Sequence, residues 1–369
     1  MNRATRAERL ARAVAERDLD QLIVGDLVRP GDSGPDARAS TRWLTGFDGT
    51  SGLAIVGPQT RAFLTDFRYR DRAAQEVEPS FDREIAESKM IAHLASLLKG
   101  RVGFDPGTTS VAHLHKLEEA VGEAETEVEL VETEGMVEEL RRVKDDEEVA
   151  KIAEAAGLAD EVYESISAQG LAGRRERDVA RAAHARIREL GAEPAFPAIV
   201  AAGPNGAQPH ADASDREIGS GELVVWDMGA LVDGYYSDCT RTFAAGEPDA
   251  EAREVYELVR SAQQAGLDAV RAGVAGSEAD EAAREIIRDA GYGDDFGHGL
   301  GHGVGLEIHE APRLGQTSED VLAAGEVVTV EPGVYLSGKF GIRIEDLVVV
   351  TEDGNRVLTT IPKELRVVA

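Results

Sequence analysis

The second half of the chain repeats apolar residues at the three- and four-residue spacing that is typical of amphipathic helices. Acidic residues at Asp145–Glu148 suit the positive end of the first such helix. Asp280 stands three residues after Ser277, which predicts a near capping box at the start of the last one. The expected helices cover residues 145–170, 176–190, 249–272 and 277–290.

Each pair of predicted helices is followed by strand-like sequence, and two of these strands match one another. GELVVWDMG (Gly221–Gly229) and GEVVTVEPG (Gly325–Gly333) align without gaps at an offset of 104 residues. Each is followed by a second apolar strand, YYSDCTRTF or GIRIEDLVVV. We therefore expect the chain from about residue 145 onward to hold two copies of helix, helix and hairpin.

The front of the chain mixes helix and strand patterns and differs from the repeated part. It opens with an amphipathic helix, has strand-like segments broken by turn glycines over Ser40–Val56, and has another strand candidate at Ala62–Arg70. These patterns predict an N-terminal domain over residues 1–130 and a C-terminal domain over residues 131–369.

The amino-acid composition of the chain limits the kinds of binding partner and the cellular location that can be expected. A net charge of −29, spread along the chain, argues against nucleic acid or an anionic membrane as partner. Only seven of the 40 basic residues are lysines, which favours a halophile with a salt-rich cytoplasm over an ordinary acidic mesophile. The single cysteine, Cys239, excludes an intrachain disulfide, and no apolar run is long enough to span a membrane. A cytoplasmic location is expected.

Both predicted hairpins set carboxylates side by side. The first is expected to turn between Val232 and Asp233, and the second at Gly338. The facing pairs are then Asp227 with Asp238 and Glu331 with Glu345. Directly opposed carboxylates destabilise a sheet, and these flanks are strongly apolar, so the four acids require a cation or protonation.

Two other interpretations of these acids stay open. All four could be exposed residues of an already acidic protein. They could also pair with Arg241 and Arg343, although two arginines cannot neutralise four acids.

The stretch GHGLGHGVGLEIHE (Gly297–Glu310) adds histidines to the acids. If it runs as a strand, His298 and His302 share one face, whereas His309 needs a bulge or a strand end to join them. One imidazole with four carboxylates is typical of a site for two divalent metal ions, manganese or cobalt first, with zinc or iron as alternatives. A phosphate loop would need a following helix and a Lys-Ser/Thr pair, which this stretch lacks.

Four spaced motifs then resemble the pita-bread metallopeptidases, which include methionine aminopeptidase, aminopeptidase P, prolidase and the metal-free creatinase. They are WDMGALVDGYYSDCTRTF, GHGLGHGVGLEIHEAPR, VVTVEPGVYL and GIRIEDLVVV, in the family order. WLTGFDGTSGLAIV and TDFRYRDRA resemble the first domain of the prolidase, aminopeptidase P and creatinase branch. The resemblance implies an α+β protein, in which a creatinase-like α/β domain precedes a duplicated pita-bread catalytic domain.

The resemblance also implies roles for individual residues. The metal ligands would be Asp227, Asp238, His302, Glu331 and Glu345. Asp227 would serve one metal, His302 and Glu331 the other, and the remaining two acids both. The further active-site residues would be His210, His298, His309, Tyr335 and Arg343, with Glu331 also moving a proton. His210 could instead be a surface histidine and Tyr335 a strand aromatic. Cys239 is expected in the core, and the other histidines, at 93, 113, 115 and 184, in structural or surface places.

The reaction implied is hydrolysis of the N-terminal Xaa-Pro bond of dipeptides or short peptides by a hydroxide that bridges the two metals. Arg313 could grip the free carboxylate of a dipeptide or be an exposed structural arginine. Methionine aminopeptidase is an alternative, although its usual form lacks the front domain. A non-catalytic or creatinase-like protein is another, although it would be expected to lack metal ligands, and none is missing here. Relatives are commonly homodimers, so a homodimer is expected.

Overall fold

A computed structural model describes residues 3–28, 38–87, 89–124 and 127–368. The chain divides into two compact units, Met1–Arg141 and Arg142–Ala369, here called the N-terminal and C-terminal units. The domain boundary after residue 130 remains a prediction.

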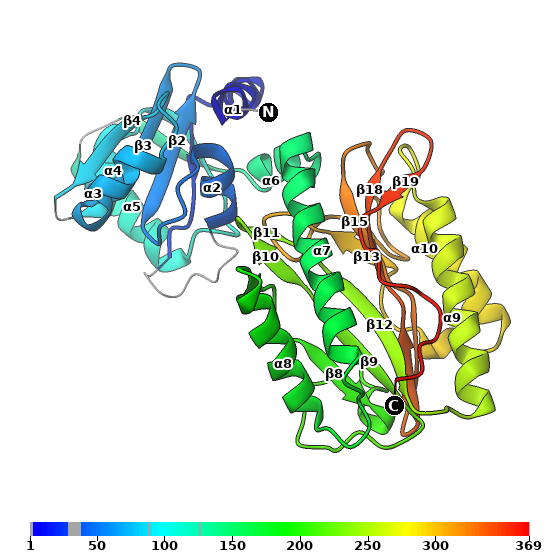
Figure 1. Ribbon diagram of the computed structural model, residues 1–369. Helices are drawn as coiled ribbons and strands as arrows, with labels where there is room; N and C mark the ends of the chain where they lie inside the picture. Colours follow the sequence, from blue (N-terminus) through cyan, green and yellow to red (C-terminus); the bar gives the residue numbers. More distant parts are fainter. Residues whose placement is uncertain (1–2, 29–37, 88, 125–126, 369) are drawn as a thin grey trace. The chain divides into compact units, whose positions relative to one another are not determined.

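The N-terminal unit is a mixed sheet with helices packed on it (Figure 1). Its described strands follow the order β4-β3-β2-β1-β5-β6, antiparallel around β2 and parallel at both edges. The strands are β1 (Gln21–Val24), β2 (Gly52–Gly57), β3 (Thr60–Asp66), β4 (Asp82–Ala86), β5 (Gly100–Phe104) and β6 (Val128–Glu132). The helices are α1 (Arg3–Glu16), α2 (Ala39–Thr45), α3 (Arg70–Glu76), α4 (Met90–Leu97), α5 (Val111–Glu123) and α6 (Met136–Arg142).

Two strand predictions in this unit need correction. Residues Ala39–Thr45 form helix α2 instead of a strand, and Gly46, with φ 88°, ends it in the left-handed conformation that glycine adopts without strain. Strand β3 ends at Asp66, because the Asp66 side chain accepts a hydrogen bond from the Arg68 amide and starts a turn of 3₁₀ helix there.

The C-terminal unit repeats one arrangement, a helix pair followed by antiparallel strands (Figure 1). Its helices are α7 (Asp146–Ser167), α8 (Glu176–Glu189), α9 (Ala250–Ala269) and α10 (Gly276–Asp289). The strands of the first half are β7 (Glu193–Pro194), β8 (Ile199–Ala202), β9 (Glu222–Met228), β10 (Ala230–Val232), β11 (Tyr235–Tyr236) and β12 (Cys239–Ala245). Those of the second half are β13 (Gly301–Gly303), β14 (Glu310–Leu314), β15 (Val327–Val330), β16 (Gly333–Leu336), β17 (Phe340–Arg343), β18 (Asp346–Val350) and β19 (Asn355–Val357).

Each helix pair covers its own half of the strands, so the unit has two apolar cores. In the first, Tyr163 of α7 packs on Trp226 of β9, with ring centroids 4.9 Å apart, and Phe243 of β12 completes the cluster. In the second, α9 and α10 pack on β15 and β18. The predicted acids lie in or directly beside these strands: Asp227 in β9, Asp238 before β12, Glu331 after β15 and Glu345 before β18.

The N-terminus of α7 agrees with the prediction, whereas that of α10 differs from it. Asp145 caps α7 through a complete capping box with Glu148. Helix α10 already begins at Gly276, and no side chain caps it, so the near capping box predicted at Ser277 is wrong. Asp280 instead turns inward to Arg284, one helical turn further on.

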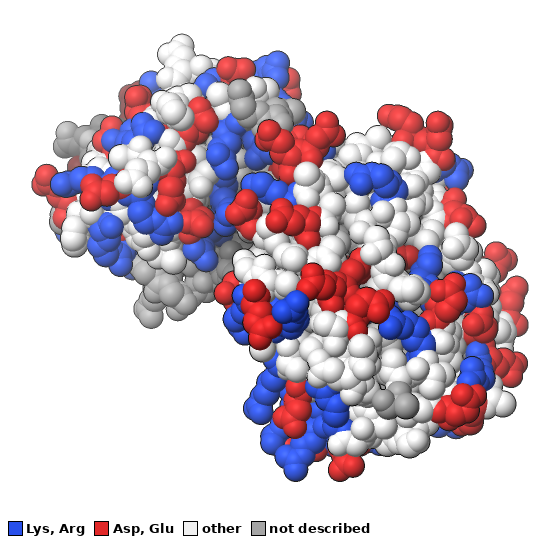
Figure 2. Space-filling view, in the orientation of Figure 1, with Lys and Arg blue, Asp and Glu red and all other residues white. Residues whose placement is uncertain are grey.

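Charged side chains are scattered over the face shown in Figure 2, with acidic and basic groups interspersed. Cys239 is a buried free thiol in the core of the first half, as expected. Within the described ranges, every helix is too short or too polar to cross a membrane.

Candidate metal centre

The first hairpin brings Asp227 and Asp238 to one face, but in a different register from the predicted one. Asp233 and Gly234 form the turn, with φ values of 48° and 78° as in a type I′ turn. The turn centre therefore lies one residue later than expected, and Asp227 faces Thr240 instead of Asp238. Asp238 stands two residues before Thr240, so strand alternation keeps it on the same side as Asp227.

The second hairpin has the predicted register. Strands β16 and β17 pair Leu336 with Phe340 around the turn at Gly338, and β15 and β18 pair Val330 with Asp346. Continuing this register between the two ladders sets Glu331 opposite Glu345.

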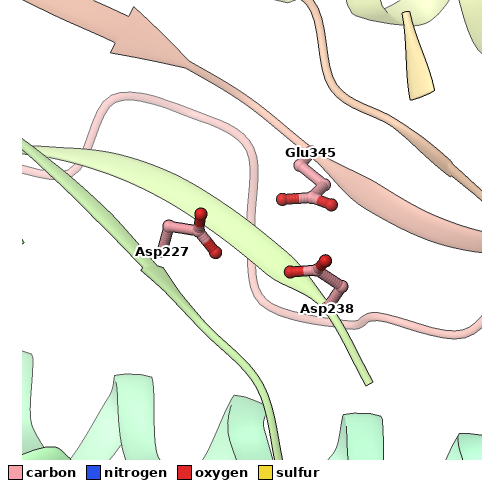
Figure 3. Close-up of side chains that lie close together, drawn as sticks. All are labelled: Asp227, Asp238 and Glu345. Atoms are coloured by element: carbon pink, nitrogen blue, oxygen red, sulfur yellow. The ribbon is translucent and has the colours of Figure 1, made fainter. Parts of the chain in front are cut away.

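The two hairpins bring their acids together in one cluster. Carboxylate oxygens of Asp227, Asp238 and Glu345 lie within 4.8 Å of one another and point toward a common centre (Figure 3). Nε2 of His302 lies 3.4 Å from Oε1 of Glu331 and 3.7 Å from Oδ2 of Asp238. All five predicted ligands thus meet, although they come from strands far apart in sequence.

Only Gly301–Gly303 of the glycine-rich stretch form a strand, so His302 lies on it whereas His298 precedes it, and the expected shared strand face does not apply to His298. The pairing of β13 with β14 shifts between His302 and Gly303, and β14 begins directly after His309. The rings of His302 and His309 lie 4.3 Å apart, so the bulge brings His309 beside the cluster. A Cβ on Gly301 would lie 2.0 Å from the Thr329 carbonyl oxygen, which explains why the packed strand needs a glycine there.

No helix follows this stretch in the described chain, since β14 comes next. The absence of a strand-loop-helix unit rules out a phosphate loop.

Arg343 links both halves of the centre. It donates to Oδ2 of Asp227 at 2.7 Å, to the Thr240 hydroxyl at 2.9 Å and to the Tyr335 hydroxyl at 2.9 Å. The Tyr335 hydroxyl is also 3.0 Å from Nε2 of His298. One arginine therefore orients an acid, a threonine and, through tyrosine, a histidine.

The alternative pairing with two arginines does not occur. Arg241 turns away from the four acids and donates to Asp346 at 2.7 Å and to the carbonyls of Glu345 and Ile361. Arg343 alone cannot balance four carboxylates.

Several positioning residues escaped the sequence interpretation. Asp280 and Arg284 form a buried ion pair at 2.7 Å, and Arg284 donates to the carbonyl of His298 at 2.6 Å. The Thr329 hydroxyl donates to Glu331 at 3.2 Å, and that of Thr240 to Glu345 at 2.7 Å. The i,i+4 spacing of Asp280 and Arg284 on a helix was a usable signal; the threonines gave none.

Burial and mutual repulsion perturb the carboxyl groups. Burial, and then the Glu345 and Asp227 carboxylates, raise the pKa of Asp238 well above its usual range. The pKa of Glu345 rises similarly, first through burial and then through Glu331. Burial raises the pKa of Glu331 to about 7 despite the opposing charge of Arg343, and it raises the pKa of Asp227. The cluster therefore holds protons unless a cation takes their place.

The pKa values of His298 and His302 shift in the opposite direction. Burial lowers the pKa of His302 to about 3 and that of His298 to about 4. Both imidazoles are neutral at neutral pH, and a neutral imidazole is the form that binds a metal.

The cluster forms one wall of a cavity of about 450 Å³. Beside the five acidic and histidine ligands, His210, His298, His309, Arg313 and Arg343 line it. The histidines at 93, 113, 115 and 184 are absent from its lining, and His93 and His184 have local partners in Glu84 and the Ala198 amide.

The donor set fits divalent metal ions. Within the described structure, Oδ1 of Asp227 and Oε1 of Glu345 are buried and have no hydrogen-bond partner, and both oxygens belong to the cluster. Buried carboxylate oxygens are rarely left unpaired, whereas oxygen-rich sites with one imidazole suit manganese, cobalt, iron or zinc.

With this geometry in place, sequence comparison defines the class of protein. The model of metallopeptidase family M24 matches residues 150–352, and that of the creatinase/prolidase N-terminal domain matches residues 6–143. The chain belongs to metallopeptidase family M24, with a creatinase-type N-terminal domain in front of the catalytic domain.

Relatives and solved structures agree. An Xaa-Pro dipeptidase of Pyrococcus furiosus is 35% identical over 368 residues, which are 98% of this chain and 99% of that protein. The structure of an Xaa-Pro dipeptidase from Bacillus anthracis matches with a TM-score of 0.92 at 37% identity, covering 99% of this chain and all of that chain (100%). An X-Pro aminopeptidase from Thermotoga maritima matches with a TM-score of 0.88 at 35% identity, covering 98% of this chain and 100% of that one.

Proposed function

We propose that this metallopeptidase is an Xaa-Pro dipeptidase that uses two divalent metal ions. The observation that carries the proposal is the meeting of two buried and two largely buried carboxylates with a neutral histidine on the wall of one cavity. The similarity to Xaa-Pro dipeptidases over nearly the whole chain supports the substrate class.

The metal ions would be held by Asp227, Asp238, His302, Glu331 and Glu345, with manganese or cobalt as the first candidates. When bound, they would supply Lewis-acid chemistry, polarising the scissile carbonyl and lowering the pKa of a water molecule.

The chain's own groups perform the proton transfers and the orientation. Glu331, which lines the cavity, can accept a proton from water and deliver it to the leaving proline nitrogen. His309 lines the cavity and can donate a hydrogen bond to the developing oxyanion. The neutral ring of His298 also lines the cavity; its Nδ1 donates to the Gly299 carbonyl and its Nε2 accepts from the Tyr335 hydroxyl. Arg343 fixes Asp227 and, through Tyr335, the orientation of His298.

Arg313 supports a dipeptide as substrate. It lines the same cavity as His309, and its guanidinium can bind the free carboxylate that a dipeptide carries directly after proline. A longer peptide has no carboxylate at that place. Xaa-Pro aminopeptidase is the second candidate, favoured by the similarity to the Thermotoga maritima enzyme.

The remaining alternatives have less support. The creatinase/prolidase N-terminal domain over residues 6–143 argues against methionine aminopeptidase. A creatinase-like protein without metal would leave the buried cluster uncompensated. We further propose that the protein is a homodimer, because members of the family are commonly dimers. The acidic, lysine-poor composition is the ground for proposing the cytoplasm of a salt-adapted organism as its location.

Assays of chelated and reloaded protein test the proposal. Protein loaded with manganese or cobalt should bind two ions per chain and cleave Xaa-Pro dipeptides faster than Xaa-Pro tripeptides. A preference for tripeptides would assign the aminopeptidase function instead. Metal-free protein that binds no ion and cleaves neither substrate would refute both.

A further inference from the structure

The segment 304–326 connects the strand that carries His302 to the strand that leads to Glu331, and it forms part of the cavity wall. Ile308, His309, Arg313 and Leu314 of this segment line the cavity. The position of the segment therefore determines where His309 and Arg313, the two side chains proposed to contact the substrate, lie.

Three acidic residues of this segment form ion pairs with Arg142 and Lys144, the first two basic residues of the C-terminal unit. Nζ of Lys144 lies 2.6 Å from Oε1 of Glu310, and the two side chains are only 2% and 9% exposed. Arg142 binds Asp320 at 2.9 Å and Glu326 at 2.8 Å, and the Glu326 side chain is 1% exposed. The Lys144 amide also donates to the carbonyl of Gly325 at 3.0 Å.

Each acid in turn holds the backbone of the segment. Asp320 accepts from the amide of Arg313 at 2.8 Å, and Glu326 from the amide of Ala323 at 2.9 Å. Glu310 follows His309 directly and accepts from the Glu307 amide at 3.4 Å, which closes the turn before β14. The cations thus act on His309 and Arg313 through one intervening carboxylate.

We propose that Lys144 and Arg142 are positioning residues for the substrate. Removing one member of a buried ion pair leaves a charge that must find water, so the partner carboxylate moves and takes its backbone with it. Loss of Lys144 would displace Glu310 and, with it, the neighbouring His309; loss of Arg142 would free Asp320 and the amide of Arg313. The kinetic consequence rests on the proposed function, whereas the structural one does not.

The test compares Lys144→Met with Lys151→Met, a matched control. Lys151 lies on α7, and its ion-pair partner, at 3.4 Å, is Asp233 in the first hairpin turn instead of an acid of segment 304–326. In Lys144→Met, amide hydrogen exchange should speed up within residues 304–316 and stay unchanged in β9 and β12. With manganese at wild-type occupancy, kcat/KM for an Xaa-Pro dipeptide should fall roughly tenfold to a hundredfold.

A second variant separates positioning from general destabilisation. Glu310→Gln in the Lys144→Met background removes the carboxylate charge that Lys144 no longer balances, so the double variant should recover part of the lost kcat/KM and of the slow exchange. Unchanged exchange and kinetics in Lys144→Met, or faster exchange throughout the C-terminal unit, would overturn the inference. If the wild-type protein cleaves no Xaa-Pro substrate, the proposed function fails, and exchange in residues 304–316 still decides the positioning role.

Discussion

The hydroxyl of Thr240 joins the two repeats of the C-terminal unit: it donates to Oε2 of Glu345 at 2.7 Å and accepts from Nε of Arg343 at 2.9 Å. Thr240 also stands directly opposite Asp227 in the first hairpin. A residue outside the proposed ligand set therefore fixes a proposed ligand from the other half of the chain, which is how partners behind the ligands commonly tune a metal site.

Thr240→Val should weaken metal binding by about 10–100-fold, because Glu345 loses the donor that fixes one of its oxygens. Valine keeps the branched shape but leaves Nε of Arg343 without its acceptor. Isothermal titration of chelated protein with manganese measures the change. Thr351→Val, at an exposed position, is the control and should bind manganese as the wild type does. Equal affinities for all three proteins would contradict the role of Thr240.

Tyr335→Phe should lower kcat roughly tenfold while the metal content stays unchanged. The phenol hydroxyl connects Arg343 to Nε2 of His298, and its removal frees a ring that lines the cavity. Steady-state kinetics with metal analysis on the same samples provides the measurement. Tyr256→Phe, which removes a hydroxyl bonded to the Lys363 carbonyl, is the control. A loss of metal in Tyr335→Phe would show that the hydroxyl acts on the ligands instead.

Arg313→Met should raise KM for Xaa-Pro dipeptides about tenfold, because a charged hydrogen bond to the substrate carboxylate is lost. Xaa-Pro tripeptides lack a carboxylate at that place and should be affected much less. The exposed Arg356→Met serves as control for the loss of one positive charge. Equal effects of Arg313→Met on both substrates would indicate a structural role for this arginine.

Metal-free protein should lose stability as the pH rises from about 6.5 to 8.5. The pKa values of Asp238, Glu345 and Glu331 are raised by burial, that of Glu331 to about 7, so the folded state binds more protons than the unfolded state. Stability then falls with rising pH, on the order of 1–3 kcal/mol over this window. The lowered pKa values of His298 and His302 act with the opposite sign, but only below about 6.5.

Calorimetry of chelated and manganese-loaded protein across this pH range checks the sign. The stabilisation by manganese should grow with pH, because binding requires deprotonated ligands. Chelated protein whose melting temperature rises between pH 6.5 and 8.5 would contradict the buried, proton-holding cluster.

Local sequence patterns were enough to predict the helices of the repeats, the second hairpin and which acids share a face. Those features depend on local periodicity: strand alternation keeps Asp227 and Asp238 on one side even though the turn at Asp233 and Gly234 shifts their register. The matching strands that begin with GEL and GEV revealed the duplication, because their similarity is also a local feature of the sequence.

Contacts between side chains that are distant in sequence could be found only from the folded structure. Periodicity could not distinguish Arg343, which reaches Asp227, from Arg241, which turns to Asp346, because their neighbours come from segments about a hundred residues away in sequence. It could not place His309, since a bulge breaks the alternation on which such an inference depends. The sequence also could not predict the threonine hydroxyls that donate to the acids, or the cations that pair with segment 304–326. Their partners are selected by long-range packing instead of by a local pattern.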